Sequence, residues 1–181
     1  MKGWKFFKRK EKVTNGKKGL LVLIDYDNID SHLMSHGRRI DFSKLMIDLL
    51  KIGKVKHVFL FIPFGSYHGL PPNINNLGYE IIVCQKMDMI DDSEKREDKV
   101  DSRMALMAKN FLSYEDITDV VIMTHDRHSI EMAAEAVKDD KIVSYFAIKN
   151  EMARDLQEFF EEYNINVYPI PTKERKTIFN I

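Results

Sequence analysis

The stretch LLVLIDYDNID, residues 20–30, carries the strongest signal for the fold. It opens with aliphatic side chains only, and such a continuous apolar run is typical of a parallel strand that is covered on both faces. The run ends abruptly at Asp25, and Asp27 and Asn28 follow within three residues. The sequence therefore predicts a buried strand over residues 20–25 that delivers carboxylates to its carboxyl end.

Further apolar runs alternate along the chain with amphipathic segments, which is the order of an α/β fold with a mostly parallel sheet. The predicted strands span residues 20–25, 57–63, 79–84, 119–125, 142–148 and 165–170. The predicted helices span residues 42–52, 100–112, 129–138 and 151–162. An apolar stripe from Val100 to Phe111 has helical spacing, so we expect it to pack in the core. The turn-rich link over residues 65–78 has room for one short helix.

The length of 181 residues, with 44% hydrophobic and 31% charged residues, is that of a soluble protein of one domain. We expect this domain over residues 19–181, after a basic extension over residues 1–18. No apolar run approaches the roughly 20 residues of a membrane span, so no membrane partner is expected. Cys84 is the single cysteine and lies in an apolar run, which predicts a buried thiol and favours a cytoplasmic location.

The extension over residues 1–18 holds eight Lys or Arg against one acid, with Trp4, Phe6 and Phe7 between them. Such a segment can neutralise phosphates and stack on unpaired bases, which would make RNA a partner. The alternative is a solubilising tail, because basic tails are common. The sequence does not decide whether subunits pair, so a homodimer is left open.

Several aspartates are predicted to meet at the carboxyl edge of the sheet, where open parallel sheets bind ligands. The first strand delivers Asp25 and Asp27, the fourth delivers Asp126, and Asp101 lies at the start of a predicted helix. Converging carboxylates repel one another, so a cation or shared protons normally sustain them. Oxygen ligands without cysteine suit Mg²⁺ or Mn²⁺, which support phosphodiester hydrolysis. The alternative for any one of these aspartates is a helix N-cap.

Three blocks of the sequence resemble motifs of the NYN domain, the LabA-like branch of the PIN-like ribonuclease superfamily. The blocks are LLVLIDYDNI, KVDSRMA and VVIMTHDRHSIEMAAEAV. In that family a first strand ends in Asp-x-x-Asn, a Lys-x-Asp motif opens a central helix, and a later strand ends in a Ser-Gly-Asp-x-Asp-like turn. The resemblance runs from about residue 20 to about residue 170. It implies a three-layer α/β/α sandwich with a PIN-like (Rossmannoid) sheet in the strand order 3-2-1-4-5.

The resemblance also implies roles for individual residues. It makes Asp25, Asp101 and Asp126 the catalytic metal ligands, and Asp27 is the candidate for a fourth carboxylate. The residues that would orient the site or the substrate are Asn28, Lys99 and Thr124, the last in place of the family's serine. The implied cofactor is Mg²⁺ or Mn²⁺.

The turn THDRHS, residues 124–129, departs from the family pattern. His128 replaces the second aspartate, which removes one negative charge, and His125 replaces the glycine. A histidine can bind Mn²⁺ or transfer a proton, so His128 is a candidate site residue. The alternative for both histidines is a turn residue that hydrogen-bonds to the backbone. Arg127, between them, either contacts a phosphate or is solvated.

Three functions follow from these features. The first is a metal-dependent ribonuclease, in which ions bound by the aspartates activate water against an RNA phosphodiester. The second is a catalytically degenerate module of the same fold that binds RNA or a protein partner. The third is a haloacid-dehalogenase-like phosphatase that uses Asp25 and Asp27 as its opening pair. Against the third, Asn28 and Ile29 follow where a threonine or valine is needed.

Overall fold

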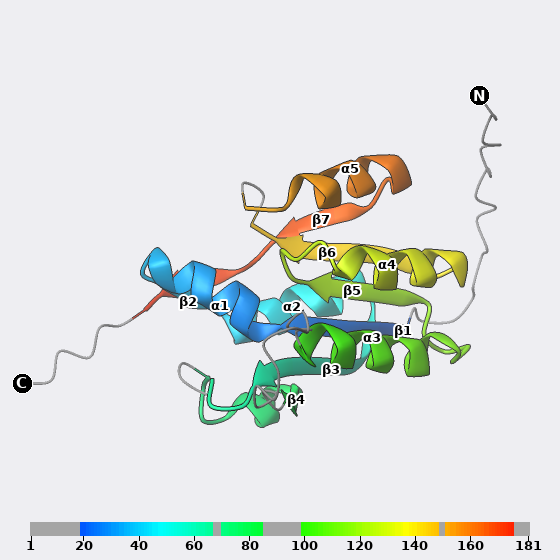
Figure 1. Ribbon diagram of the computed structural model, residues 1–181. Helices are drawn as coiled ribbons and strands as arrows, with labels where there is room; N and C mark the ends of the chain where they lie inside the picture. The colour runs from blue at the N-terminus through cyan, green and yellow to red at the C-terminus, as the bar shows by residue number, and fades with distance from the viewer. Residues whose placement is uncertain (1–18, 67–69, 85–98, 149–150, 176–181) are drawn as a thin grey trace, which may run out of the picture.

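Six parallel strands form the central sheet of the computed structural model, which describes residues 19–66, 70–84, 99–148 and 151–175 (Figure 1). The strands are β1 (Gly19–Asp25), β3 (Lys54–Pro63), β4 (Glu80–Cys84), β5 (Asp119–Met123), β6 (Ile142–Ala147) and β7 (Asn166–Pro169). Their order across the sheet is β4-β3-β1-β5-β6-β7. The predicted order of the first five strands is confirmed. The sixth predicted strand corresponds to β7, which lies beside β6 as the outermost strand of the sheet.

The order of the strands reverses at β1. From β1 the chain builds outward through β3 to β4, and β5 then returns to the other side of β1. Ile24 of β1 lies beside Met123 of β5, so the residues that follow these two strands emerge side by side. This is the carboxyl edge at the switch point, where an open parallel sheet binds ligands.

Helices cover both faces of the sheet and complete the predicted three-layer sandwich (Figure 1). The helices are α1 (Tyr26–Ser35), α2 (Phe42–Ile52), α3 (Lys99–Leu112), α4 (Ser129–Lys138) and α5 (Arg154–Tyr163). Leu21 on β1 belongs to the core that includes residues of α3, α4 and α5, whereas its neighbour Val22 belongs to the core that includes residues of α1 and α2. Because both faces of each central strand are buried, the strands are continuously apolar.

Of the five α-helices in the described residues, four match the prediction. The bounds of α2, α3 and α4 agree with it to within one residue, and α5 begins at Arg154 instead of residue 151. The stripe on α3 packs in the core as expected, since Val100 and Met104 are both buried. The described part of the turn-rich link contains a short 3-10 helix, η1 (Ile74–Leu77).

Helix α1 follows β1 without a loop and was not predicted. Asp25 ends β1 and caps α1, because its Oδ1 atom accepts the backbone N–H of Asn28 at 3.3 Å. Tyr26, Ile29 and Leu33 form the buried stripe of the helix. The N-cap alternative is therefore confirmed for Asp25. Capping and metal binding are compatible, because a carboxylate has two oxygens.

A two-stranded antiparallel sheet was also not predicted. It pairs β2 (Arg38–Ile40) with β8 (Thr172–Glu174). Strands of three residues are too short for an alternating pattern to reveal them. The backbone N–H of Asp41 donates to Pro171 next to this pair, so the sheet ties the segment after β7 to the start of α2.

Three further expectations concern the rest of the chain. Cys84 is buried, as predicted. The helices that the structure describes are all too short or too polar to cross a membrane. The basic extension over residues 1–18 and residues 176–181 of the expected domain lie outside the described residues.

Candidate metal site

The turn between β5 and α4 is held by hydrogen bonds to Asp126. Its Oδ1 atom accepts the backbone N–H of His128 at 3.0 Å. Its backbone oxygen accepts the N–H of Ser129 at 3.2 Å and the Ser129 hydroxyl at 2.7 Å. The N-cap residue of α4 is His128, and its side chain makes no capping hydrogen bond. Asp126 therefore takes over the capping of this helix start.

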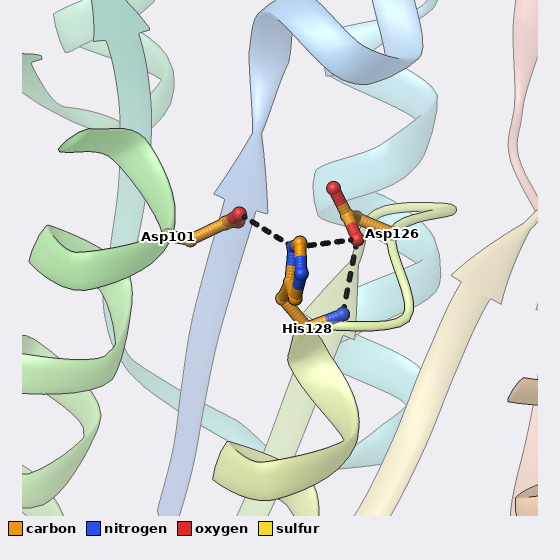
Figure 2. A group of neighbouring side chains, drawn as sticks. All are labelled: Asp101, Asp126 and His128. Atoms are coloured by element: carbon orange, nitrogen blue, oxygen red, sulfur yellow. Dashed lines mark hydrogen bonds and ion pairs between the residues drawn. The ribbon is translucent and has the colours of Figure 1, made fainter. Parts of the chain in front are cut away.

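Asp101, Asp126 and His128 bring their side chains together at the carboxyl edge (Figure 2). Asp101 lies in the first turn of α3, where the helix dipole favours a carboxylate. The Nδ1 atom of His128 lies 3.3 Å from Asp101 Oδ2 and 3.1 Å from Asp126 Oδ1. One ligand atom from each residue lies within 4.8 Å of the other two. The aspartates are half-buried and His128 is exposed, so ions from solvent reach this group.

The donor set of this three-residue group fits a divalent cation. Ligand atoms in adjacent octahedral positions at about 2.1 Å from a metal lie about 3 Å apart, close to the two distances from His128 Nδ1. Two carboxylates supply negative charge, and an imidazole nitrogen favours a transition metal such as Mn²⁺ over Mg²⁺, which prefers oxygen. Without a metal, the same distances suit an Nδ1–H that His128 donates to both carboxylates.

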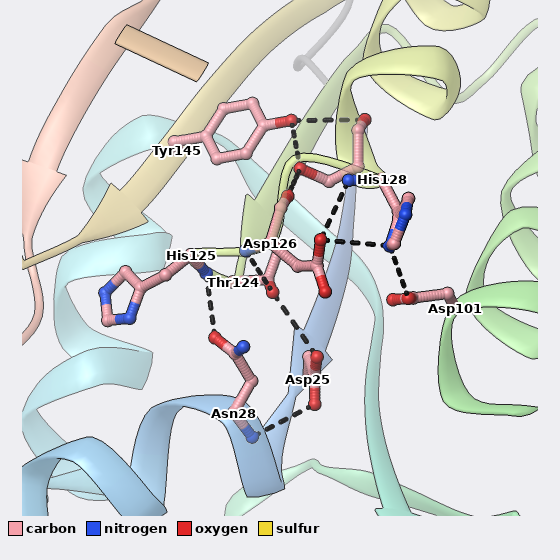
Figure 3. Close-up of polar contacts among 9 residues, drawn as sticks. Asp25, Asn28, Asp101, Thr124, His125, Asp126, His128 and Tyr145 are labelled. Carbon is pink, nitrogen blue, oxygen red and sulfur yellow. Dashed lines mark hydrogen bonds and ion pairs between the residues drawn. The ribbon is translucent and has the colours of Figure 1, made fainter. Parts of the chain in front are cut away.

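Asp25 lies at the same edge in a buried position (Figure 3). Its Oδ2 atom accepts the Thr124 hydroxyl at 3.3 Å, whereas its other oxygen, Oδ1, caps α1. Thr124 is also buried and accepts the backbone N–H of Asp126 at 3.2 Å, so it links Asp25 to the β5–α4 turn. The described group within 4.8 Å does not include Asp25, and its ligand role stays a prediction.

Asn28 and His125 hold α1 against this turn. The Oδ1 atom of Asn28 accepts the backbone N–H of His125 at 2.8 Å, and the orienting role of Asn28 stays a prediction. The ring of His125 points away from Asp101, Asp126 and His128 (Figure 3), and its Nε2 atom accepts the N–H of Ile148 at 3.0 Å. Burial and the nearby His32 lower the pKa of His125 to about 4. His125 is therefore a neutral side chain that hydrogen-bonds to the backbone, as one alternative predicted.

Three other predicted site residues have no role that the structure shows. Asp27 is half-buried in the first turn of α1 and is not a member of the three-residue group. Lys99 is the first residue of α3, two positions before Asp101. Arg127 is exposed in the β5–α4 turn. Their roles stay predictions.

Two residues that hold the turn were not predicted. Ser129 contacts Asp126, and a serine at the start of a predicted helix is a recognised capping signal. Tyr145 on β6 is fully buried, and its hydroxyl donates to Ser129 Oγ at 3.1 Å. No local pattern marks Tyr145, because this contact joins residues 16 positions apart.

Comparison with known proteins shows the fold and no family. No protein-family model matches the chain, and no curated protein matches it. The crystal structure of a protein of unknown function from Vibrio parahaemolyticus RIMD 2210633 is similar, with a TM-score of 0.68 at 13% sequence identity. The match covers 86% of this chain and 94% of that chain. At this identity the likeness shows the shared α/β fold alone.

Proposed function

We propose that the chain is a metal-dependent ribonuclease that hydrolyses RNA phosphodiester bonds at the carboxyl edge of its sheet. One observation carries the proposal: Asp101, Asp126 and His128 place two carboxylates and an imidazole within 4.8 Å of one another. They do so beside the switch point of an open parallel sheet, where ligands bind. The buried Asp25 is joined to the same turn through Thr124.

The proposed roles follow from the contacts of each residue. Asp101, Asp126 and His128 would hold Mn²⁺ or Mg²⁺. When bound, such an ion polarises a phosphoryl oxygen and lowers the pKa of a bound water. The backbone N–H of His128 orients the Asp126 carboxylate, and Thr124 orients that of Asp25. Arg127 is exposed in the same turn and is the candidate contact for a substrate phosphate.

Two sequence features support RNA as the substrate. The three motifs resemble those of the NYN domain in the same order along the chain, and that family belongs to a ribonuclease superfamily. The basic extension over residues 1–18 carries aromatic side chains between its positive charges. Positive charge binds the phosphate backbone, and aromatic rings stack on unpaired bases.

Cleavage assays with the purified full-length chain test the proposal. We expect cleavage of single-stranded, structured or transfer RNA with MnCl₂, and its loss on addition of a chelator. Asp126→Asn keeps a hydrogen-bond acceptor but removes a ligand charge, so we expect a loss of activity of about 100-fold. Asp48→Asn is the matched control, because Asp48 lies on α2 and pairs only with exposed lysines in the contacts shown. Absence of cleavage with either metal, or an Asp126→Asn variant as active as the parent, would overturn the proposal.

One observation favours a second function. His128 Nδ1 lies between the carboxylates of Asp101 and Asp126, and a protonated imidazole there would supply the positive charge of a cation. The chain would then be a catalytically degenerate module that binds RNA or a protein partner. Titration calorimetry separates the two functions. Mn²⁺ binding that Asp101→Asn abolishes supports the ribonuclease, whereas RNA binding without Mn²⁺ binding supports the module.

A further inference from the structure

A chain of hydrogen bonds leads from the proposed metal site into the core of the protein (Figure 3). The Tyr145 hydroxyl donates to Ser129 Oγ at 3.1 Å, and the Ser129 hydroxyl donates to the backbone oxygen of Asp126 at 2.7 Å. The N–H of Asp126 then donates to Thr124 Oγ1 at 3.2 Å. The turn that carries Asp126 and His128 is thus held at two points of the Asp126 backbone, the N–H by Thr124 and the carbonyl oxygen by Ser129.

The inner end of this chain of hydrogen bonds is buried and packed in the core. Tyr145 is fully buried on β6, next to β5 in the sheet. Its ring packs against Phe160 of α5 with ring centroids 4.5 Å apart. Ser129 is also buried, and it is the first residue of α4, directly after His128. The position of the hydroxyl is therefore set by the sheet and by α5, and not by the exposed turn.

We propose that Tyr145 and Ser129 are positioning residues that fix the β5–α4 turn, so that Asp126 and His128 stay within reach of Asp101. The inference rests on the proposed function, because it concerns the same site. Neither residue belongs to the group of Asp101, Asp126 and His128. Loss of the Tyr145 hydroxyl leaves Ser129 Oγ without this donor and loosens the anchor of the turn. Supporting residues of this kind typically change metal affinity by about 10- to 100-fold.

Tyr145→Phe with Tyr79→Phe as its control tests this inference. Tyr79 is also a buried tyrosine, and its hydroxyl donates at 2.7 Å to the backbone of Phe42, the first residue of α2. Each substitution therefore removes one buried hydroxyl that contacts the start of a helix, at a similar cost in stability. Of these two tyrosines, Tyr145 contacts Ser129, which in turn hydrogen-bonds to Asp126 in the turn of the proposed site.

Titration of the folded full-length variants with MnCl₂ gives the first readout. We expect Tyr145→Phe to bind Mn²⁺ about tenfold more weakly than the parent, and Tyr79→Phe to bind within about twofold of it. Equal affinities in the two variants would overturn the inference while leaving the proposed function intact. If Tyr145→Phe does not fold, Ser129→Ala, which keeps the Tyr145 ring, is judged by the same criterion.

The NMR signals of the His128 imidazole give a readout that needs no metal. We expect these signals to shift in Tyr145→Phe and not in Tyr79→Phe, because only the first change releases the turn. Unshifted His128 signals in Tyr145→Phe would overturn the inference even for a chain that binds no Mn²⁺. Failure of the parent to bind Mn²⁺ contradicts the proposed function instead, so the two failures are distinguishable.

Discussion

The two edges of the parallel sheet each bury an aspartate beside a threonine. At the amino edge, Asp119 accepts the hydroxyl of Thr118 at 2.7 Å. At the carboxyl edge, Asp25 accepts the hydroxyl of Thr124 at 3.3 Å. Both aspartates are buried, whereas Thr124 is buried and Thr118 only half-buried, so a buried carboxylate with a hydroxyl partner occurs at both edges and does not by itself define a site.

The difference lies in what surrounds each pair. The carboxyl edge adds Asp101 from the start of α3 and Asp126 and His128 from the β5–α4 turn. Among the residues that the structure describes, no second group of three such side chains gathers at ligand distance. The amino edge is instead closed by main-chain contacts, such as the N–H of Thr118 donating to Gly19 at 2.9 Å. The amino edge is thus held by main-chain hydrogen bonds, whereas charged and ionisable side chains gather at the carboxyl edge.

The largest expected effect concerns the amino edge. A side chain on Gly19 would overlap the backbone oxygen of Asp116, and a backbone atom cannot move aside cheaply. We expect Gly19→Ala to lower the free energy of unfolding by about 3 kcal/mol. Urea denaturation measures this change.

The control for this variant is Gly37→Ala. Gly37 has a φ of 66°, and nothing lies within 4 Å of an added Cβ, so the cost there is only the left-handed backbone, about 1 kcal/mol. Equal losses in the two variants would show that the amino edge is not closely packed around Gly19. If the folded Gly19→Ala variant binds Mn²⁺ with unchanged affinity, the proposed metal site at the carboxyl edge does not depend on the packing of the amino edge.

A smaller effect is expected from a matched pair of charge removals. Asp25→Asn and Asp119→Asn each replace a buried carboxylate that accepts a threonine hydroxyl, so their effects on stability should be similar. We expect Asp25→Asn to weaken Mn²⁺ binding by about tenfold, because it removes negative charge next to the proposed site. Asp119→Asn should leave that binding unchanged. If both variants bind Mn²⁺ like the parent, Asp25 serves only as a cap and a structural partner.

The last expected effect is a pH dependence of stability that comes from His125 at the carboxyl edge. Burial and His32 lower the pKa of His125 from 6.5 to about 4, so the unfolded chain binds this proton before the folded chain does. The resulting stability is fully present above pH 6.5 and is lost as the pH falls toward 4. In urea denaturation, His125→Gln should therefore lose less stability than the parent between pH 6.5 and pH 4. Equal losses would show that His125 is not held neutral in the folded protein.

Long apolar runs made most of the sheet predictable. Strand β1 is buried on both faces, so its sequence is a continuous apolar run, a pattern that segments of three residues are too short to show. Helix α1 is not predicted because the polar residues Asp25 and Asn28 also fit the pattern of a site at a strand end, although Tyr26, Ile29 and Leu33 have helical spacing. The β2–β8 pair joins segments of three residues from distant parts of the chain, and no local pattern could predict it.

The sequence predicts that Asp101 and Asp126 meet, but not the contacts that they make. Asp101 is a candidate because it lies at the start of a predicted helix, and Asp126 because it directly follows a predicted strand. Whether they meet depends on how the first turn of α3 approaches the β5–α4 turn, which is a property of packing. The sequence marked His128 as a departure from a family pattern, but its position between the two carboxylates appears only in the fold.

The central claim is that Asp101, Asp126 and His128 bind a divalent metal. Anomalous scattering from crystals soaked in MnCl₂ tests this claim most directly. The predicted result is a peak within about 2 to 2.6 Å of an oxygen of each aspartate and of His128 Nδ1. An Mn²⁺-soaked crystal with no peak there, and with His128 Nδ1 still bridging Asp101 and Asp126, would contradict the claim.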